Sequence, residues 1–98
     1  MKPEMIRKLV LPACREFDVR RLDLFGSVAR GEEKEFQDLD FLVEFDNPDQ
    51  RPSKRFFGLL HFLEDVLKRP VDLVTAGAIS NPYFRERIMK ERKNVYDG

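Results

Sequence analysis

Two aspartates one residue apart, Asp38 and Asp40, enter an apolar run in the middle of this 98-residue chain. Aspartate is uncommon in strands because it favours turns and is costly to bury. Side chains alternate between the two faces of a strand, so both carboxylates would point the same way. Their repulsion would raise the pKa of one of them unless a cation lay between them. The pair therefore predicts a divalent-metal site, and the alternative is a pair of solvated acids on an edge strand.

A glycine and a serine, Gly26 and Ser27, precede this pair and offer a second kind of chemistry. The glycine permits a tight turn and lets a ligand approach the backbone closely. The serine can cap a short helix or donate its hydroxyl to a phosphate oxygen, and the free amides of a helix start attract anions. With Arg30 to neutralise charge, this corner predicts a cradle for the outer phosphates of a nucleotide. The alternatives are an ordinary turn and a surface arginine.

A third acid, Asp72, is embedded in the apolar segment Val71–Val74. If that segment pairs with the strand that begins after Asp38, three carboxylates come together. Three carboxylates can support two magnesium ions, because Mg²⁺ prefers oxygen ligands. Asp72 could also accept the proton of an attacking hydroxyl as a general base. The alternative is an acid at the end of a strand that faces solvent.

The elements that must carry these residues follow from apolar periodicity and from turn residues. Strands are predicted over residues 20–25, 39–45 and 71–75 and around Val95 and Tyr96. Helices are predicted over residues 3–17 with a bend at Pro12, over 27–30, from about Ser53 with that residue as its cap, and from Pro82 after a cap at Asn81. Tyr83, Phe84, Ile88 and Met89 are expected to line the buried side of the last helix. The alternation indicates one small α/β (α+β) domain over residues 1–98.

Charge is balanced overall, with 18 basic and 18 acidic residues, but it is unevenly distributed. Acids dominate residues 31–50 and bases dominate from residue 51 onward, which suits a metal site that faces phosphates or a charged partner. The zero net charge gives no global signature of nucleic-acid binding. The lone Cys14 excludes an internal disulfide, and no apolar run is long enough to cross a bilayer, so we expect a cytoplasmic protein without a membrane partner.

The combination of Gly26-Ser27, Asp38-x-Asp40 and Asp72 resembles the pattern of the polymerase-beta-type nucleotidyltransferase superfamily. The segments LFGSVARGE, DLDFLVEF and LKRPVDLVT are similar to its minimal nucleotidyltransferase (MNT) branch, which includes the MntA-like antitoxins of HEPN/MNT toxin–antitoxin pairs. The resemblance covers roughly residues 22–96. Gln37 is one departure, because many relatives carry serine there, but that position is not a metal ligand. The fold implied is a mixed sheet of three to four strands flanked by helices.

The resemblance implies an Mg²⁺-dependent enzyme that moves AMP from ATP to a hydroxyl, a tyrosine, of a HEPN RNase toxin and so silences it. One alternative is a binding module that silences its partner by stoichiometric occlusion. Another is a transferase for a small molecule or an RNA end, with the acceptor site on another subunit of a homo- or hetero-oligomer. No direct binding of nucleic acid is expected. The catalytic and metal-binding residues implied are Asp38, Asp40 and Asp72, and the residues implied to hold ATP are Gly26, Ser27 and Arg30.

Overall fold

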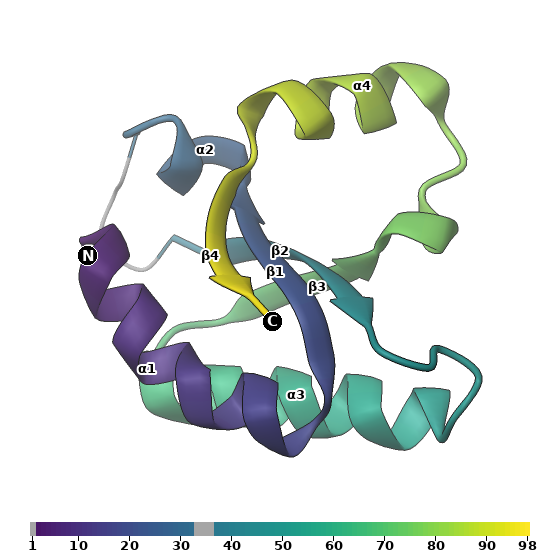
Figure 1. The fold of residues 1–98 in the computed structure, drawn as a ribbon. Coiled ribbons are helices and arrows are strands. Elements are labelled where there is room, and N and C mark those ends of the chain that lie inside the picture. The colour runs from purple at the N-terminus through teal and green to yellow at the C-terminus, as the bar shows by residue number, and fades with distance from the viewer. Residues whose placement is uncertain (1, 33–36) are drawn as a thin grey trace.

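The computed structural model describes residues 2–32 and 37–98, and its elements are drawn in Figure 1. The strands are β1 (Val19–Phe25), β2 (Leu39–Phe45), β3 (Val71–Thr75) and β4 (Lys93–Asp97). The helices are α1 (Pro3–Glu16), α2 (Gly26–Ala29), α3 (Pro52–Leu67) and α4 (Pro82–Glu91), and the short 3₁₀ turn η1 spans Ala76–Ala78. Residues 33–36, which belong to the acidic stretch, lie outside the described residues. Within the described ranges, no helix is both long enough and apolar enough to cross a membrane.

The four strands form one mixed sheet in the order β3-β2-β1-β4. β1 lies antiparallel to both β2 and β4, whereas β2 and β3 run parallel. A parallel pair needs a long crossover connection, and α3 provides it. This mixed sheet with flanking helices confirms the predicted fold class. The parallel pairing also brings the starts of β2 and β3, where the predicted acids lie, to the same end of the sheet.

One face of the sheet is covered by α1 and α3, which lie side by side beneath it in Figure 1. We call this the helix-covered face. Alternate residues of each strand point into it and meet the apolar sides of both helices. Burial of one such side chain contributes roughly 1.5–3 kcal/mol, so this layer is the main source of stability. Its fully buried residues include Ile6, Val10, Leu22, Leu39, Phe41, Leu59 and Leu63.

The opposite face of the sheet is covered by α4, and we call it the α4 face. In the part of the chain that the structure describes, the apolar contacts of this face centre on a small group formed by Phe25, Leu42 and Ile88 with a few partly buried neighbours. Beside this group lies Asp23, whose side chain is only 1% exposed and pairs with Arg92 at 3.3 Å. Arg21 and Asn94 also donate to the same carboxylate. The α4 face therefore combines a small core with buried charge.

The starts of α3 and α4 illustrate two ways to begin a helix. At α4 the Oδ1 atom of Asn81 accepts hydrogen bonds from the backbone amides of Tyr83 (2.9 Å) and Phe84 (3.2 Å), which confirms the predicted cap. The predicted cap of α3 at Ser53 is wrong, because the helix already begins at Pro52, after Arg51 in a left-handed conformation. Proline has no amide to satisfy and its fixed φ suits the first helical position, so Ser53 falls inside the first turn.

The buried side of α4 is smaller than predicted. Ile88 is buried as expected, and Met89 is partly buried. Tyr83 and Phe84 are 81% and 46% exposed, so their predicted burial is wrong. The reason is geometric, because α4 makes its buried contact with the sheet through Ile88. Phe84 meets the ring of Phe25 only edge to face, so much of its own ring stays exposed. In α1, Pro12 lies inside the helix without ending it.

A buried arginine, Arg55, links two loops at one end of the sheet. The guanidinium of Arg55 lies 4.6 Å from the ring centre of Phe45 and is hydrogen-bonded only to backbone carbonyls among its described partners. Five donors on a planar group allow one side chain to satisfy several carbonyls at once. Arg55 thereby ties the end of α1 to the loop between β2 and α3. The carbonyls belong to Phe17, Asp18, Asp46, Asn47 and Gln50.

Candidate functional site

The corner between β1 and α2 places a glycine where no other residue fits. Gly26 has a φ of +77°, in the left-handed region that L side chains rarely adopt. A Cβ atom at this position would overlap the carboxylate of Asp40. The missing side chain therefore allows the Asp40 carboxylate to rest directly against the backbone of the corner, whereas the close approach of a ligand there stays a prediction.

The register of the two parallel strands brings two of the predicted acids together. Asp40 of β2 is paired with Asp72 of β3, and its other neighbour in the sheet is Phe25 of β1. Residues paired in register point to the same face, and here that is the α4 face, because Leu39 and Phe41 point into the opposite core. Asp40 is partly buried, whereas Asp72 is exposed. The structure thus joins acids that lie far apart in the sequence.

The environment of Asp40 favours a bound cation. Its pKa is raised, chiefly because burial disfavours the charged carboxylate, and further by the charges of Asp72 and Asp38, while the charge of Arg30 lowers it. A divalent cation would reverse this balance by neutralising the repulsion between carboxylates. The donor set consists of carboxylate oxygens, which are the ligands that Mg²⁺ prefers. The residues present therefore fit a magnesium ion.

Asp38 occupies a different position from the other two acids. It is exposed and lies just before β2, outside the set of side chains that line the cleft described below. Across residues 2–32 and 37–98, no three histidine, cysteine or acidic side chains are gathered into a ready-made metal site. The assignment of Asp38, Asp40 and Asp72 as three ligands therefore stays a prediction, with Asp40 and Asp72 already side by side.

The serine of the corner is linked to the residue that precedes the acids. The side-chain amide of Gln37 donates to the hydroxyl oxygen of Ser27. The carbonyl oxygen of Gln37 in turn accepts two hydrogen bonds from the guanidinium of Arg69, at 2.8 and 3.1 Å. Gln37 thus connects the corner, the entry to β2 and the entry to β3. Sequence reasoning identified Gln37 only as a departure from the usual serine and did not predict this contact.

A cleft of about 310 Å³ collects these groups on the α4 face. Five of the six predicted site residues line it, namely Gly26, Ser27, Arg30, Asp40 and Asp72. The opposite wall comes from α4, for which the sequence predicted a buried apolar side but no role in the site. It contributes Phe84, Arg87, Ile88 and Glu91.

Three charged side chains of the cleft, Arg30, Arg87 and Glu91, are already paired with one another. Glu91 accepts a hydrogen bond from Nη1 of Arg30 at 3.0 Å and one from Nε of Arg87 at 3.2 Å. Nε of Arg30 also donates to Glu32 at 2.9 Å. The predicted phosphate-binding arginine therefore lies in the cleft, but in the free protein its partners are two carboxylates.

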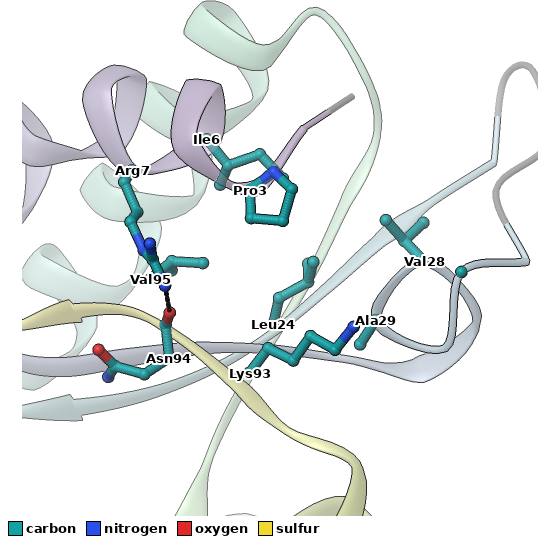
Figure 2. Close-up of a pocket in the computed structure, with 10 residues that line it drawn as sticks. Pro3, Ile6, Arg7, Leu24, Val28, Ala29, Lys93, Asn94 and Val95 are labelled. Atoms are coloured by element: carbon teal, nitrogen blue, oxygen red, sulfur yellow. Dashed lines mark hydrogen bonds between the residues drawn. The ribbon is translucent and has the colours of Figure 1, made fainter.

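A second cavity, of about 510 Å³, lies between α1, α2 and β4 and is shown in Figure 2. Apolar side chains such as Leu24 and Val28 line it, together with Lys93. Arg7 also lines it and donates to the backbone carbonyl of Asn94 at 3.1 Å. Among its described lining residues there is no carboxylate, the side-chain ligand by which proteins usually hold magnesium. The cleft on the α4 face is accordingly the candidate site.

Comparison with known proteins gives consistent matches along the chain. A family model described as nucleotidyltransferase domain matches residues 6–95, a range that includes every predicted site residue. A Methanocaldococcus jannaschii protein with the provisional name protein adenylyltransferase is 36% identical over 88 residues, which cover 90% of this chain and 88% of that protein. A solved structure described as a minimal nucleotidyltransferase is 35% identical, with a TM-score of 0.77 over 95% of both chains.

A more distant structure shares the fold. It is the Shewanella oneidensis complex of a tri-AMPylated HEPN toxin with an MNT antitoxin, one chain of which matches with a TM-score of 0.65. The identity is 17%, and the match covers 99% of this chain and 74% of that chain. At this level of identity the likeness concerns the arrangement of helices and strands alone.

Proposed function

The chain belongs to the nucleotidyltransferase domain family and is an enzyme of that class, and from this premise we propose that it transfers AMP from ATP to a tyrosine hydroxyl of a partner protein. The observation that carries the proposal is the pairing of Asp40 with Asp72 beside the Gly26 corner in one cleft. A related M. jannaschii protein provisionally bears the name protein adenylyltransferase, which supports a protein as the acceptor.

The proposed reaction is a substitution at the α-phosphorus of ATP. A bond forms between the acceptor oxygen and this phosphorus, the bond from phosphorus to the bridging oxygen of the β-phosphate breaks, and pyrophosphate leaves. Asp72, exposed at the start of β3, accepts the proton of the acceptor hydroxyl. The corner at Gly26 and Ser27, together with Arg30, holds the triphosphate. Positioning and charge neutralisation supply most of the acceleration in this type of reaction.

Magnesium is the proposed cofactor. Asp40 and Asp72, with Asp38 as a third ligand, would hold one or two ions, which supply neutralisation of phosphate charge and activation of the attacking oxygen. Burial and the charges of Asp72 and Asp38 raise the pKa of Asp40, and a bound cation would offset these effects, which supports this role. ATP is proposed as the nucleotide on the basis of the family resemblance and of the relative's name.

The proposed partner is a HEPN-domain RNase toxin, which would make this chain its antitoxin. The support is the fold shared with the S. oneidensis complex, in which a HEPN toxin carries AMP groups and is bound to an MNT antitoxin. Loss of RNase activity after addition of substoichiometric enzyme with ATP would agree with catalysis. A strict one-to-one requirement, independent of ATP, would instead indicate silencing by occlusion.

The test uses ATP labelled at the α-phosphate, magnesium and the partner co-purified from the source cell. We expect label on the partner with the wild-type chain and none with the Asp38→Asn, Asp40→Asn double variant, and mass spectrometry would locate the acceptor residue. Asp65→Asn, an exposed acid on α3 outside the cleft, is the matched control and should transfer normally. ATP labelled at the γ-phosphate should give no label. Normal transfer by a folded Asp40→Asn variant would refute the proposed site.

A further inference from the structure

The cleft contains an ionic cluster of three side chains, Arg30, Arg87 and Glu91, of which the proposed reaction uses only Arg30. Its centre is Glu91, which lies at the C-terminal end of α4. The side chain of Glu91 is 23% exposed. Two guanidiniums from different parts of the chain converge on this one carboxylate, Arg30 from the end of α2 and Arg87 from the preceding turn of α4. All three side chains line the same cleft as Asp40 and Asp72. The cluster therefore faces the place where the substrate would bind.

A carboxylate that accepts from two guanidiniums shows that the pair already forms an anion site. Guanidiniums present planar, fixed donors that suit phosphate oxygens as well as carboxylate oxygens. Burial tends to raise the pKa of Glu91, but the hydrogen bonds from Arg87 and Arg30 outweigh it and the pKa is lowered. Glu91 is therefore an anion at neutral pH and occupies the site in its charged form.

We propose that Arg87 and Arg30 together bind the β- and γ-phosphates of the nucleotide, and that Glu91 occupies their site until the polyphosphate displaces it. The inference rests on the proposed function for the identity of the ligand. Arg87 becomes a substrate-binding residue, and Glu91 becomes an internal competitor that tunes affinity. The exchange leaves both arginines paired with an anion in either state, so neither guanidinium is left without a counter-charge when the cleft empties.

The experiment measures binding by calorimetry, with magnesium and the non-cleavable analogue α,β-methylene-ATP as the probe and AMP as the comparison. Arg87→Gln should weaken binding of the analogue about tenfold, the scale of one charge-assisted hydrogen bond, and leave AMP binding unchanged. Arg85→Gln is the matched control, because Arg85 is an exposed arginine of the same helix that does not line the cleft. It should bind the analogue like the wild type.

For the second variant, Glu91→Gln, the proposal predicts the opposite effect on analogue binding to that of Arg87→Gln. Removal of the internal anion should tighten binding of the analogue several-fold, again with little change for AMP. A merely structural ion pair would predict the reverse, since loss of Glu91 would loosen α4 and weaken binding. Thermal melts of each variant in the absence of ligand verify that the fold is intact.

Three results would overturn the inference: unchanged affinity of Arg87→Gln for the analogue, an equal loss for the analogue and AMP, or weaker binding by Glu91→Gln. Binding is measured apart from transfer, so the two hypotheses fail separately. A wild-type chain that binds the analogue with the expected variant effects but moves no label would refute the proposed function alone. Normal label transfer with no effect of Arg87→Gln on analogue binding would refute the inference alone.

Discussion

The two faces of the sheet are built from the same strands but serve different purposes. In β2, Leu39 and Phe41 point into the helix-covered face and are fully buried, whereas Asp40 and Leu42 point to the α4 face. Alternation along a strand lets neighbouring residues serve a closed core and a reactive cleft without interference. Stability and chemistry are therefore placed on opposite faces of one sheet.

The faces also differ in what holds their covering helices. α1 and α3 are held by a continuous apolar layer, while α4 is held through the small group around Ile88 and through ion pairs such as Arg30–Glu91. Burial of apolar surface is non-directional, whereas hydrogen-bonded charges can exchange one partner for another. The α4 face is thus the one that can adjust to a ligand.

The largest expected effect on stability comes from the helix-covered face. Phe41→Ala removes a fully buried ring and should lower the free energy of unfolding by about 3–5 kcal/mol. Phe84→Ala, on the α4 face, removes a ring that is 46% exposed and should lower it by about 1 kcal/mol or less. Urea denaturation of both variants measures the contrast. Equal losses would contradict the assignment of the main core to the α1–α3 side.

The next effect concerns the carbonyl cluster around Arg55. Lysine keeps the charge but has three donors in place of five, so Arg55→Lys should leave buried carbonyls unsatisfied and lower the free energy of unfolding by about 2 kcal/mol. Arg20→Lys, at an exposed position of β1, is the control and should change it by a few tenths of a kcal/mol. The same denaturation measurement would disprove the structural role of Arg55 if the two variants behaved alike.

Alanine substitutions at three glycines distinguish the effect of backbone strain from the effect of steric overlap with Asp40. Gly26→Ala should lower the free energy of unfolding by about 1–2 kcal/mol because of its positive φ. It should also lower the rate of AMP transfer by about 100-fold, because the new Cβ displaces Asp40. Gly31→Ala has the same strain, with a φ of +80°, but no atom within 4 Å of the new Cβ, so transfer should persist. Gly77→Ala should change neither quantity, since its Cβ also meets nothing and no positive φ is required. Equal loss of transfer in Gly26→Ala and Gly31→Ala would show that strain is the cause.

The smallest effect has the opposite sign. Burial and the charges of Asp72 and Asp38 raise the pKa of Asp40, so the folded state binds this proton more tightly than the unfolded chain does. The ionised carboxylate therefore opposes folding, and this opposition fades as pH falls through the raised pKa. In buffer without divalent cations, Asp40→Asn should raise the free energy of unfolding at about pH 7 by a few tenths to 1 kcal/mol, and by less near pH 4. Destabilisation at neutral pH would contradict this account, with Asp65→Asn as the control.

The sequence alone was enough to identify those site residues that interrupt an apolar pattern. Asp40 and Asp72 stand out because a charged residue inside a short strand needs an explanation, and the strands over 39–45 and 71–75 were predicted with their observed bounds. Their pairing followed once the strands were taken as neighbours. The glycine corner was predictable for a similar reason, because the residue type restricts the backbone.

The wall formed by α4 was not predictable in the same way. Arg87 and Glu91 lie on a helix with many charged residues, where nothing in their spacing separates a cleft residue from a solvated one. Phe84 followed the helical period but lies on the first turn, where α4 makes little buried contact with the sheet. Local pattern indicates which face of a helix is apolar, but the extent of the surface that meets it is set by tertiary structure.

The partners of Arg55 have a consequence for behaviour in salt. Its guanidinium is held by uncharged carbonyls, whereas the cleft is held by exposed and half-exposed ion pairs. Mobile ions screen interactions between charges near the surface over about 8 Å at physiological ionic strength, but they have little effect on hydrogen bonds to buried carbonyls. Rising ionic strength should therefore weaken the ion pairs of the cleft and leave the hydrogen bonds of Arg55 to the backbone carbonyls largely unchanged. The salt dependence of transfer would then report on the cleft rather than on the fold.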